Sequence, residues 1–165
     1  MKDVNTFSDE AKRSAGHQLG LVQAGLEPLD WKSMETVGAG VKEIRLFNRS
    51  PDKAHEMARQ FGSPVKALAW EQRHDALADA GLLVNTTTQG MQGQPALDLQ
   101  LDALPAHALV SDIVYTPLQT DLLLRAAVRG NPTVNGLGML LHQARPAFAS
   151  WFGVMPEVTP ALWAK

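Results

Sequence analysis

The sequence contains no cysteine, and its opposite charges nearly cancel. Without thiols the chain can form neither disulfides nor thiolate metal sites, which agrees with a reducing compartment. Its 15 Lys and Arg against 17 Asp and Glu leave a formal charge of −2, so there is no basic excess to attract nucleic acid. We therefore expect no nucleic-acid partner.

Long hydrophobic runs are also absent. No stretch approaches the ~20 apolar residues that a membrane-spanning helix needs, and the start, "MKDVNTFSDEAKR", lacks the apolar core of a signal peptide. The five histidines are scattered without metal-ligand spacing. We expect a cytoplasmic protein, outside the membrane and without a metal.

Short apolar runs alternate with helical patterns after residue 42, which is typical of βαβ units and a parallel sheet. The first 36 residues are more polar and lack a clear period. The pattern predicts strands over 43–47, 65–68, 82–85 and 108–115, a turn or very short strand near 131–136, and helices over 51–61, 70–79, 117–129 and 137–152.

The triplet Asn48, Arg49, Ser50 follows the first of these strands and precedes a helix that starts at Pro51. In a doubly wound sheet, ligands bind at the carboxyl ends of strands, and a helix N-terminus attracts anions. An acid at this place usually holds the ribose of NAD, whereas an Arg suits the 2′-phosphate of NADP; residues 47–51 hold no acid. A phosphate site that includes Lys53 and a capped helix with a solvated Arg are about equally supported by the triplet alone.

A glycine turn, Gly38, Ala39, Gly40, lies shortly before this triplet. In a dinucleotide fold such a turn opens a helix, but here the next strand pattern starts three residues after Gly40. A parallel crossover needs about a dozen residues, so no helix fits between them. The sequence predicts an incomplete first βα unit.

Three other segments have more ordinary interpretations when each is taken alone. "VNTTTQGM" ends a strand in three threonines, "DIVYTP" contains the only tyrosine, and "NGLGMLLHQ" begins a helix after two glycines. Taken alone, the threonines are better explained by loop formation than by ligand binding, and the tyrosine by packing. The Gln143 of the third segment would normally be a surface residue.

In their order, however, "NRSPDKA", "ALAWEQ", "LLVNTTTQGM", "SDIVYTPLQTDLL" and "NGLGMLLHQARPAFASWFG" resemble the carboxyl-terminal, NADP-binding domain of shikimate dehydrogenase and its quinate-acting relatives. The resemblance covers residues 41–165 well, and residues 20–40 and the "VNTF" at 4–7 more faintly. It implies an α/β, Rossmann-like fold whose mostly parallel sheet is flanked by helices. It also divides the chain into a remnant of the substrate domain and linker helix (1–36) and the nucleotide domain (37–165).

The resemblance implies roles for particular residues. It assigns the 2′-phosphate to residues 48–53, and the cofactor groove to Thr86, Thr87 and Thr88. It places Ile113, Gly136 and Met139 at the nicotinamide end, and Gly38, Ala39 and Gly40 at the former pyrophosphate turn. It assigns substrate binding to Asn5, Tyr115 and Gln143.

Several family motifs are missing from the sequence. The serine pair, the N-V-T-x-P-x-K segment with the catalytic Lys and the N-T-D-G segment with its Asp do not occur, and Asn135 replaces the usual Asp before G-L-G-M. The resemblance therefore implies an NADP-dependent oxidoreductase that interconverts 3-dehydroshikimate and shikimate in aromatic amino acid biosynthesis, with poor activity expected of this chain alone. The alternatives are an NADP-binding module without chemistry and an inactive scaffold. An oligomer is compatible with all three of these hypotheses.

Overall fold

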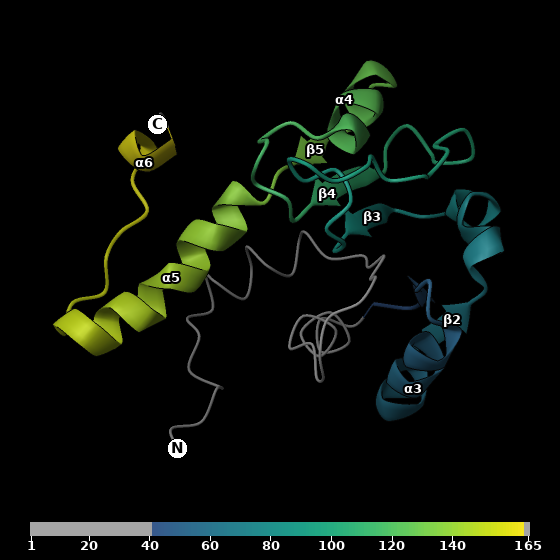
Figure 1. The fold of residues 1–165 in the computed structure, drawn as a ribbon, viewed down its shortest axis with the longest axis horizontal. Helices are drawn as coiled ribbons and strands as arrows, with labels where there is room; N and C mark the ends of the chain where they lie inside the picture. Colours follow the sequence, from purple (N-terminus) through teal and green to yellow (C-terminus); the bar gives the residue numbers. More distant parts are fainter. Residues whose placement is uncertain (1–40, 164–165) are drawn as a thin grey trace.

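The protein is described by a computed structural model over residues 41–163, in which short strands alternate with helices (Figure 1). The strands are β1 (Ile44–Phe47), β2 (Val65–Leu68), β3 (Leu82–Asn85), β4 (Leu109–Asp112) and β5 (Thr133–Val134). The α-helices are α3 (Pro51–Phe61), α4 (Asp121–Val128), α5 (Leu137–Phe152) and α6 (Pro160–Trp163). Two 3₁₀ helices, η1 (Trp70–Arg73) and η2 (Asp75–Leu77), stand between β2 and β3.

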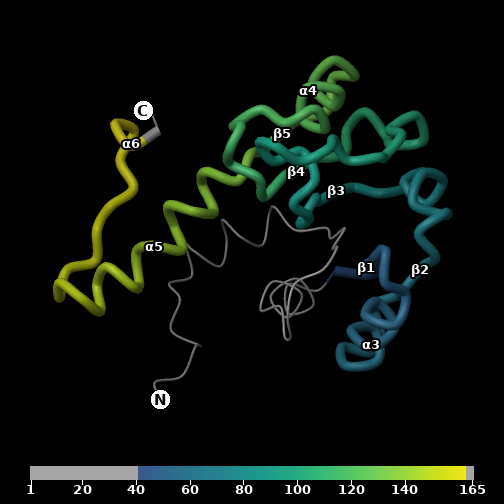
Figure 2. Tube along the Cα trace, viewed as in Figure 1, coloured from purple at the N-terminus to yellow at the C-terminus, as the bar shows by residue number. Residues whose placement is uncertain are grey.

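Every strand pairing in the described residues is parallel, as the alternating pattern predicts. β1 pairs with β2, with Ile44 opposite Val65, and β4 lies between β3 and β5, with Leu82 opposite Leu109. In Figure 2 the chain passes from the β1–α3–β2 unit to the β3–β4–β5 unit through the η1–η2 segment.

Within residues 41–163, the strands follow the order of a doubly wound sheet apart from its first strand. Such a sheet orders its strands 3-2-1-4-5-6, and the order β2-β1 followed by β3-β4-β5 supplies all positions except the first. Within residues 41–163 no strand pairs with the second edge of β1 or of β3. The glycine turn at residues 38–40 lies outside the described residues.

Two groups of buried apolar side chains hold these elements together. The smaller group joins β1, α3 and β2 through Ile44, Leu46, Ala54 and Val65. The larger one contains Leu83, Val110 and Leu122, and it also includes Phe47 from β1. Phe47 is 2% exposed, so the first sheet is anchored in the core of the second.

The long connection between β3 and β4 has no regular secondary structure but is fixed by alternate leucines. The buried leucines are Leu97, Leu99 and Leu101, which are every second residue of "LDLQL", and Leu104 further on. Arginine side chains bind its backbone: Arg125 donates to the carbonyls of Leu99 (2.6 Å) and Leu97 (3.1 Å). These bonds satisfy carbonyls that no sheet or helix would satisfy.

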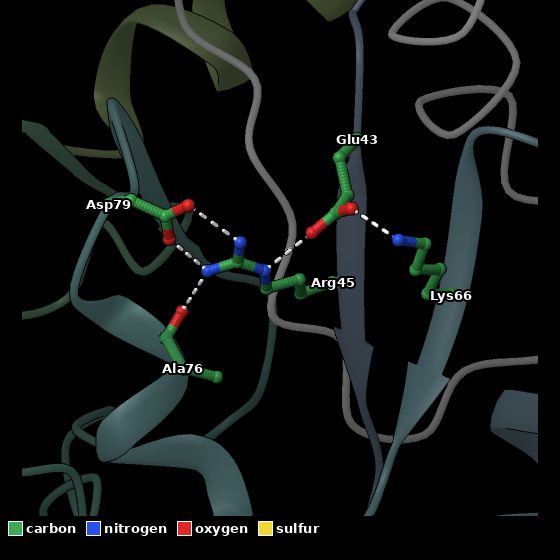
Figure 3. A network of polar contacts seen from close by, with 5 residues as sticks. All are labelled: Glu43, Arg45, Lys66, Ala76 and Asp79. Carbon is green, nitrogen blue, oxygen red and sulfur yellow. Dashed lines mark hydrogen bonds and ion pairs between the residues drawn. The ribbon is translucent and has the colours of Figure 1, made fainter.

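A polar network links β1 to its surroundings (Figure 3). The Arg45 guanidinium donates to Glu43 (2.7 Å), to the carbonyl of Ala76 (2.6 Å) and to both carboxylate oxygens of Asp79. Lys66 of β2 donates to the other oxygen of Glu43 (2.5 Å). Hydrogen bonding to Asp79 and then to Glu43 raises the pKa of Arg45, and Arg45 in turn lowers the pKa of Asp79.

Three predicted elements differ from the structure. The helix predicted over 70–79 is instead η1 and η2; the Arg73 guanidinium donates to the carbonyl of Trp70 (2.9 Å), the acceptor that an α-helix would offer to residue 74. The helix predicted over 117–129 starts only at Asp121, because Thr120 caps it by accepting from the Leu123 N–H. The strand predicted over 108–115 ends at Asp112, whose side chain accepts from the Val114 N–H and starts a turn.

Candidate functional site

The predicted site residues follow the carboxyl ends of strands. Residues 48–50 come directly after β1, 86–88 after β3, 113–115 after β4, and 135–136 after β5. Parallel strands of one sheet end at the same edge, which is where doubly wound folds bind their ligands. The topology therefore places the candidates of each sheet at the edge where doubly wound folds bind their ligands.

The segment between β1 and α3 presents a set of donors. Asn48 is 5% exposed, and its Oδ1 accepts from the Ser50 N–H (2.8 Å), which shapes the turn. Arg49, Ser50 and Lys53 are exposed. Ser50 occupies the predicted N-cap position of α3, yet its side chain makes no capping hydrogen bond.

This donor set suits a phosphate monoester. A guanidinium, an ammonium and a hydroxyl lie within six consecutive residues at the N-terminus of an 11-residue helix. The segment also contains one acid, Asp52, in the first turn of α3. An NAD-binding fold holds the ribose with an acid nearer the end of the preceding strand, so Asp52 does not occupy that position.

The loop after β3 is buried and internally bonded. Thr86 and Thr87 are each 4% exposed, and Thr88 is exposed. The Thr87 N–H donates to Asn85 Oδ1 (3.0 Å), and the Gln89 N–H donates to Thr87 Oγ1 (3.0 Å). These two turns fix the backbone path of the three threonines.

The carboxylate of Asp112 lies between this loop and the next. Asp112 is 1% exposed, and burial raises the pKa of its carboxyl above the usual range, against the opposing hydrogen bonds from Thr120, Val114 and Asn85. Asn85 Nδ2 donates to Asp112 Oδ1 (3.0 Å), and Thr120 Oγ1 donates to Asp112 Oδ2 (2.6 Å). Sequence reasoning did not single out these three buried polar residues, although Asn85 and Asp112 occupy matching last positions of paired strands.

Two of the residues assigned to the nicotinamide end are in direct contact. A Cβ on Gly136 would lie well under 3.0 Å from the carbonyl of Ile113, and the Gly136 N–H donates to the carbonyl of Val114 (3.1 Å). Met139 follows on the first turn of α5 and is half-buried. The start of α5 thus packs directly on the chain that leaves β4.

The residues assigned to the substrate are less closely associated. Tyr115 is 43% exposed and Gln143 is exposed. No hydrogen bond joins these two side chains, both of which belong to the described range. Asn5, Gly38, Ala39 and Gly40 lie outside the described residues.

Within residues 41–163, no group of three or more His, Asp or Glu side chains could hold a metal ion. None of the helices in that range has the length and apolar character required to cross a membrane.

Comparison with known proteins gives a consistent result. The family described as Shikimate 5'-dehydrogenase C-terminal domain matches residues 136–161. Shikimate dehydrogenase (NADP(+)) of Paramagnetospirillum magneticum is 57% identical over 126 residues, which cover 76% of this chain and 46% of that protein. The chain thus spans about half the length of the curated relatives it matches.

Solved structures show the same relationship. Quinate dehydrogenase from Corynebacterium glutamicum, in complex with NAD, aligns with a TM-score of 0.76 and 26% identity over 90% of this chain and 56% of that one. Shikimate 5-dehydrogenase from Thermus thermophilus, in complex with NADP(H) and shikimate, aligns with a TM-score of 0.66 and 28% identity over 90% of this chain and 56% of that one. The predicted Rossmann-like fold and the resemblance inferred from the ordered motifs are confirmed.

Proposed function

We propose, from the resemblance of this chain to the carboxyl-terminal part of shikimate dehydrogenase, that it binds NADP and serves as the nucleotide-binding part of an oxidoreductase of that type. Residues 37–165 form the NADP-binding domain in this proposal, and residues 1–36 correspond to a substrate-domain remnant and linker. The reaction would be the NADP-dependent interconversion of 3-dehydroshikimate and shikimate, or of a quinate-like substrate, in the cytoplasm.

The residues at the N-terminus of α3 give this proposal its main support. Arg49, Ser50 and Lys53 are exposed there, and residues 47–51 contain no acid to hold the free ribose of NAD. A guanidinium can make two parallel hydrogen bonds to a phosphate, and the adjacent hydroxyl and ammonium add donors to the same anion. This donor set fits the 2′-phosphate of NADP.

The other end of the cofactor would lie along the second sheet. Thr86, Thr87 and Thr88 would line the groove, and the compact junction of Ile113, Gly136 and Met139 would face the nicotinamide. The bound nicotinamide would supply the hydride acceptor or donor. Tyr115, Gln143 and Asn5 would bind hydroxyls and the carboxylate of the substrate.

Catalysis by this chain alone would be slow. Its sequence lacks the family segments that carry the Lys and Asp for proton transfer, and loss of a general acid or base costs about 100- to 10,000-fold in rate. Binding of NADP without turnover, the module alternative, is therefore the behaviour expected of the purified chain. Robust NADPH formation from NADP and shikimate would contradict that expectation.

Calorimetric titration of NADP into variants of α3 tests the assignment of the phosphate site. Arg49→Ala should weaken NADP binding by about tenfold or more, and Lys53→Ala by a smaller factor, because a point charge makes fewer directed bonds than a guanidinium. Arg59→Ala is the matched control: Arg59 lies in the last turn of the same helix, and its partner among the described residues is Glu56. Equal affinity in Arg49→Ala and Arg59→Ala would reject the site.

A further inference from the structure

The Asp112 carboxylate collects hydrogen bonds from three separate segments of the chain. Its Oδ1 accepts from Asn85 Nδ2 and from the Val114 N–H, both at 3.0 Å, and its Oδ2 accepts from Thr120 Oγ1 at 2.6 Å. These donors belong to the end of β3, the turn after β4 and the N-cap of α4. A buried carboxylate with such partners holds all three in one geometry.

The bond to Asn85 extends to the threonine loop. Asn85 uses its amide nitrogen for Asp112 and for the carbonyl of Gln89 (3.1 Å), and its amide oxygen for the Thr87 N–H. With both its nitrogen and its oxygen engaged, the Asn85 amide has one orientation that satisfies every partner. Asp112 therefore sets the orientation of Asn85, and Asn85 sets the path of residues 86–89.

The opposite side of the carboxylate holds α4 against the same loop. Thr120 donates to Asp112 and accepts from the Leu123 N–H (3.4 Å) as the cap of α4. The Thr120 side chain also limits the space beside Gly90, where a Cβ would meet it at 3.4 Å. The Gln92 N–H, further along that loop, donates to the carbonyl of Thr116 (2.9 Å).

We propose that Asp112 is a positioning residue that shapes the threonine loop for the half of NADP beyond its adenosine, without touching the cofactor itself. The proposal rests on the proposed function, because it assumes that Thr86, Thr87 and Thr88 line the cofactor groove. The adenosine end is held elsewhere, by residues 48–53 on the other sheet. The two halves of the ligand can therefore be tested separately.

The experiment measures the dissociation constants of NADP and of adenosine 2′,5′-bisphosphate, which carries only the adenosine end. In Asp112→Ala, the affinity for NADP should fall by about tenfold, since the loop loses its charged anchor, while the affinity for the bisphosphate stays unchanged. Asp112→Asn should restore most of the NADP affinity, because its amide oxygen can still accept from Asn85 and Val114. Val110→Ala, a buried apolar position of the same strand, controls for lost stability and should change neither constant.

Each alternative outcome is informative. Unchanged NADP affinity in Asp112→Ala would overturn the proposal, as would an equal loss for both ligands, which indicates a purely structural role. Failure of the wild-type chain to bind either ligand would contradict the proposed function itself. If Asp112→Ala shows no cooperative melting, Asn85→Ser decides by the same criteria, because it removes the connection to the loop and leaves Asp112 bonded to Val114 and Thr120.

Discussion

Gly136 lies where a side chain has no room. Any Cβ there would overlap the backbone carbonyl of Ile113, and backbone cannot rotate away as a flexible side chain can. Glycine is needed here because the backbone just before α5 comes very close to the backbone of the residues that follow β4. A residue assigned to the cofactor from its motif thus has a packing role as well.

Gly136→Ala should lower the free energy of unfolding by about 2 kcal/mol or more, as overpacking against fixed atoms does. Urea denaturation measures this change. Gly81→Ala is the control, because among the described residues no atom beyond its chain neighbours lies within 4 Å of the Cβ it would add. Equal stability of the two variants would show that α5 can shift without cost.

Asp112 makes folding stability depend on pH in a defined direction. Burial raises the pKa of its carboxyl above 3.8 in the folded chain. The contribution of Asp112 to the free energy of unfolding is therefore fully present below pH 3.8 and is lost as the pH rises through the raised pKa.

Asp112→Asn removes this titration and so isolates it. The free energy of unfolding of the wild type minus that of Asp112→Asn should fall as the pH rises above 3.8 and then level off. Denaturant melts at a series of pH values provide the measurement. Glu43 and Asp79, whose pKa values are lowered, contribute equally to both proteins. A difference that grows with pH would contradict the burial of Asp112 as a charged group.

At the scale of elements, β1 depends on polar contacts outside its own sheet. Arg45→Met keeps the apolar stem but removes the bonds to Ala76, Asp79 and Glu43. This substitution should lower the free energy of unfolding by about 1 kcal/mol, since the ion pair with Asp79 is largely exposed and screened.

Urea denaturation at low and high salt tests this expectation. Arg59→Met is the matched control, because that side chain is 77% exposed and its ion pair is with Glu56 of the same helix. The loss in Arg45→Met should persist in part at high salt, because the bond to the Ala76 carbonyl does not depend on a second charge. A loss no larger than that of Arg59→Met would show that the network adds nothing to the attachment of β1.

The elements that the sequence predicted well are those whose pattern is local. The helix over 51–61 combines a cap position, a proline at its start and apolar residues at helical spacing, and it forms over those residues. The strand at 82–85 and the helix at 137–152 are likewise found where their apolar patterns predict them. The 117–129 helix starts late because a distant carboxylate, Asp112, fixes its cap residue. No periodicity within one segment contains that information.

The same distinction separates the parts of the candidate site. The exposed donors after β1 could be proposed from their position before a helix. The Asn85–Asp112–Thr120 network could not, because it joins residues 27 and 8 positions apart in the sequence. Its sequence signal, a polar residue at the last position of each of two buried strands, acquires meaning only from the strand register.

At the scale of the whole molecule, the proposed function assigns the two halves of NADP to two different sheets. The adenosine end would bind beside β1 and the remainder beside β3 and β4, while Phe47 and the Arg45 network connect these units. NADP would then contact both and stabilise the folded chain in proportion to its affinity.

The measurement that tests this account most directly is a calorimetric comparison of NADP with NAD on the wild-type chain. The two ligands differ only in the 2′-phosphate that Arg49, Ser50 and Lys53 are proposed to hold. NADP should bind about tenfold or more tightly than NAD, since a phosphate gains charge-assisted hydrogen bonds that a ribose hydroxyl does not. Equal affinities, or no binding of either nucleotide, would contradict the account.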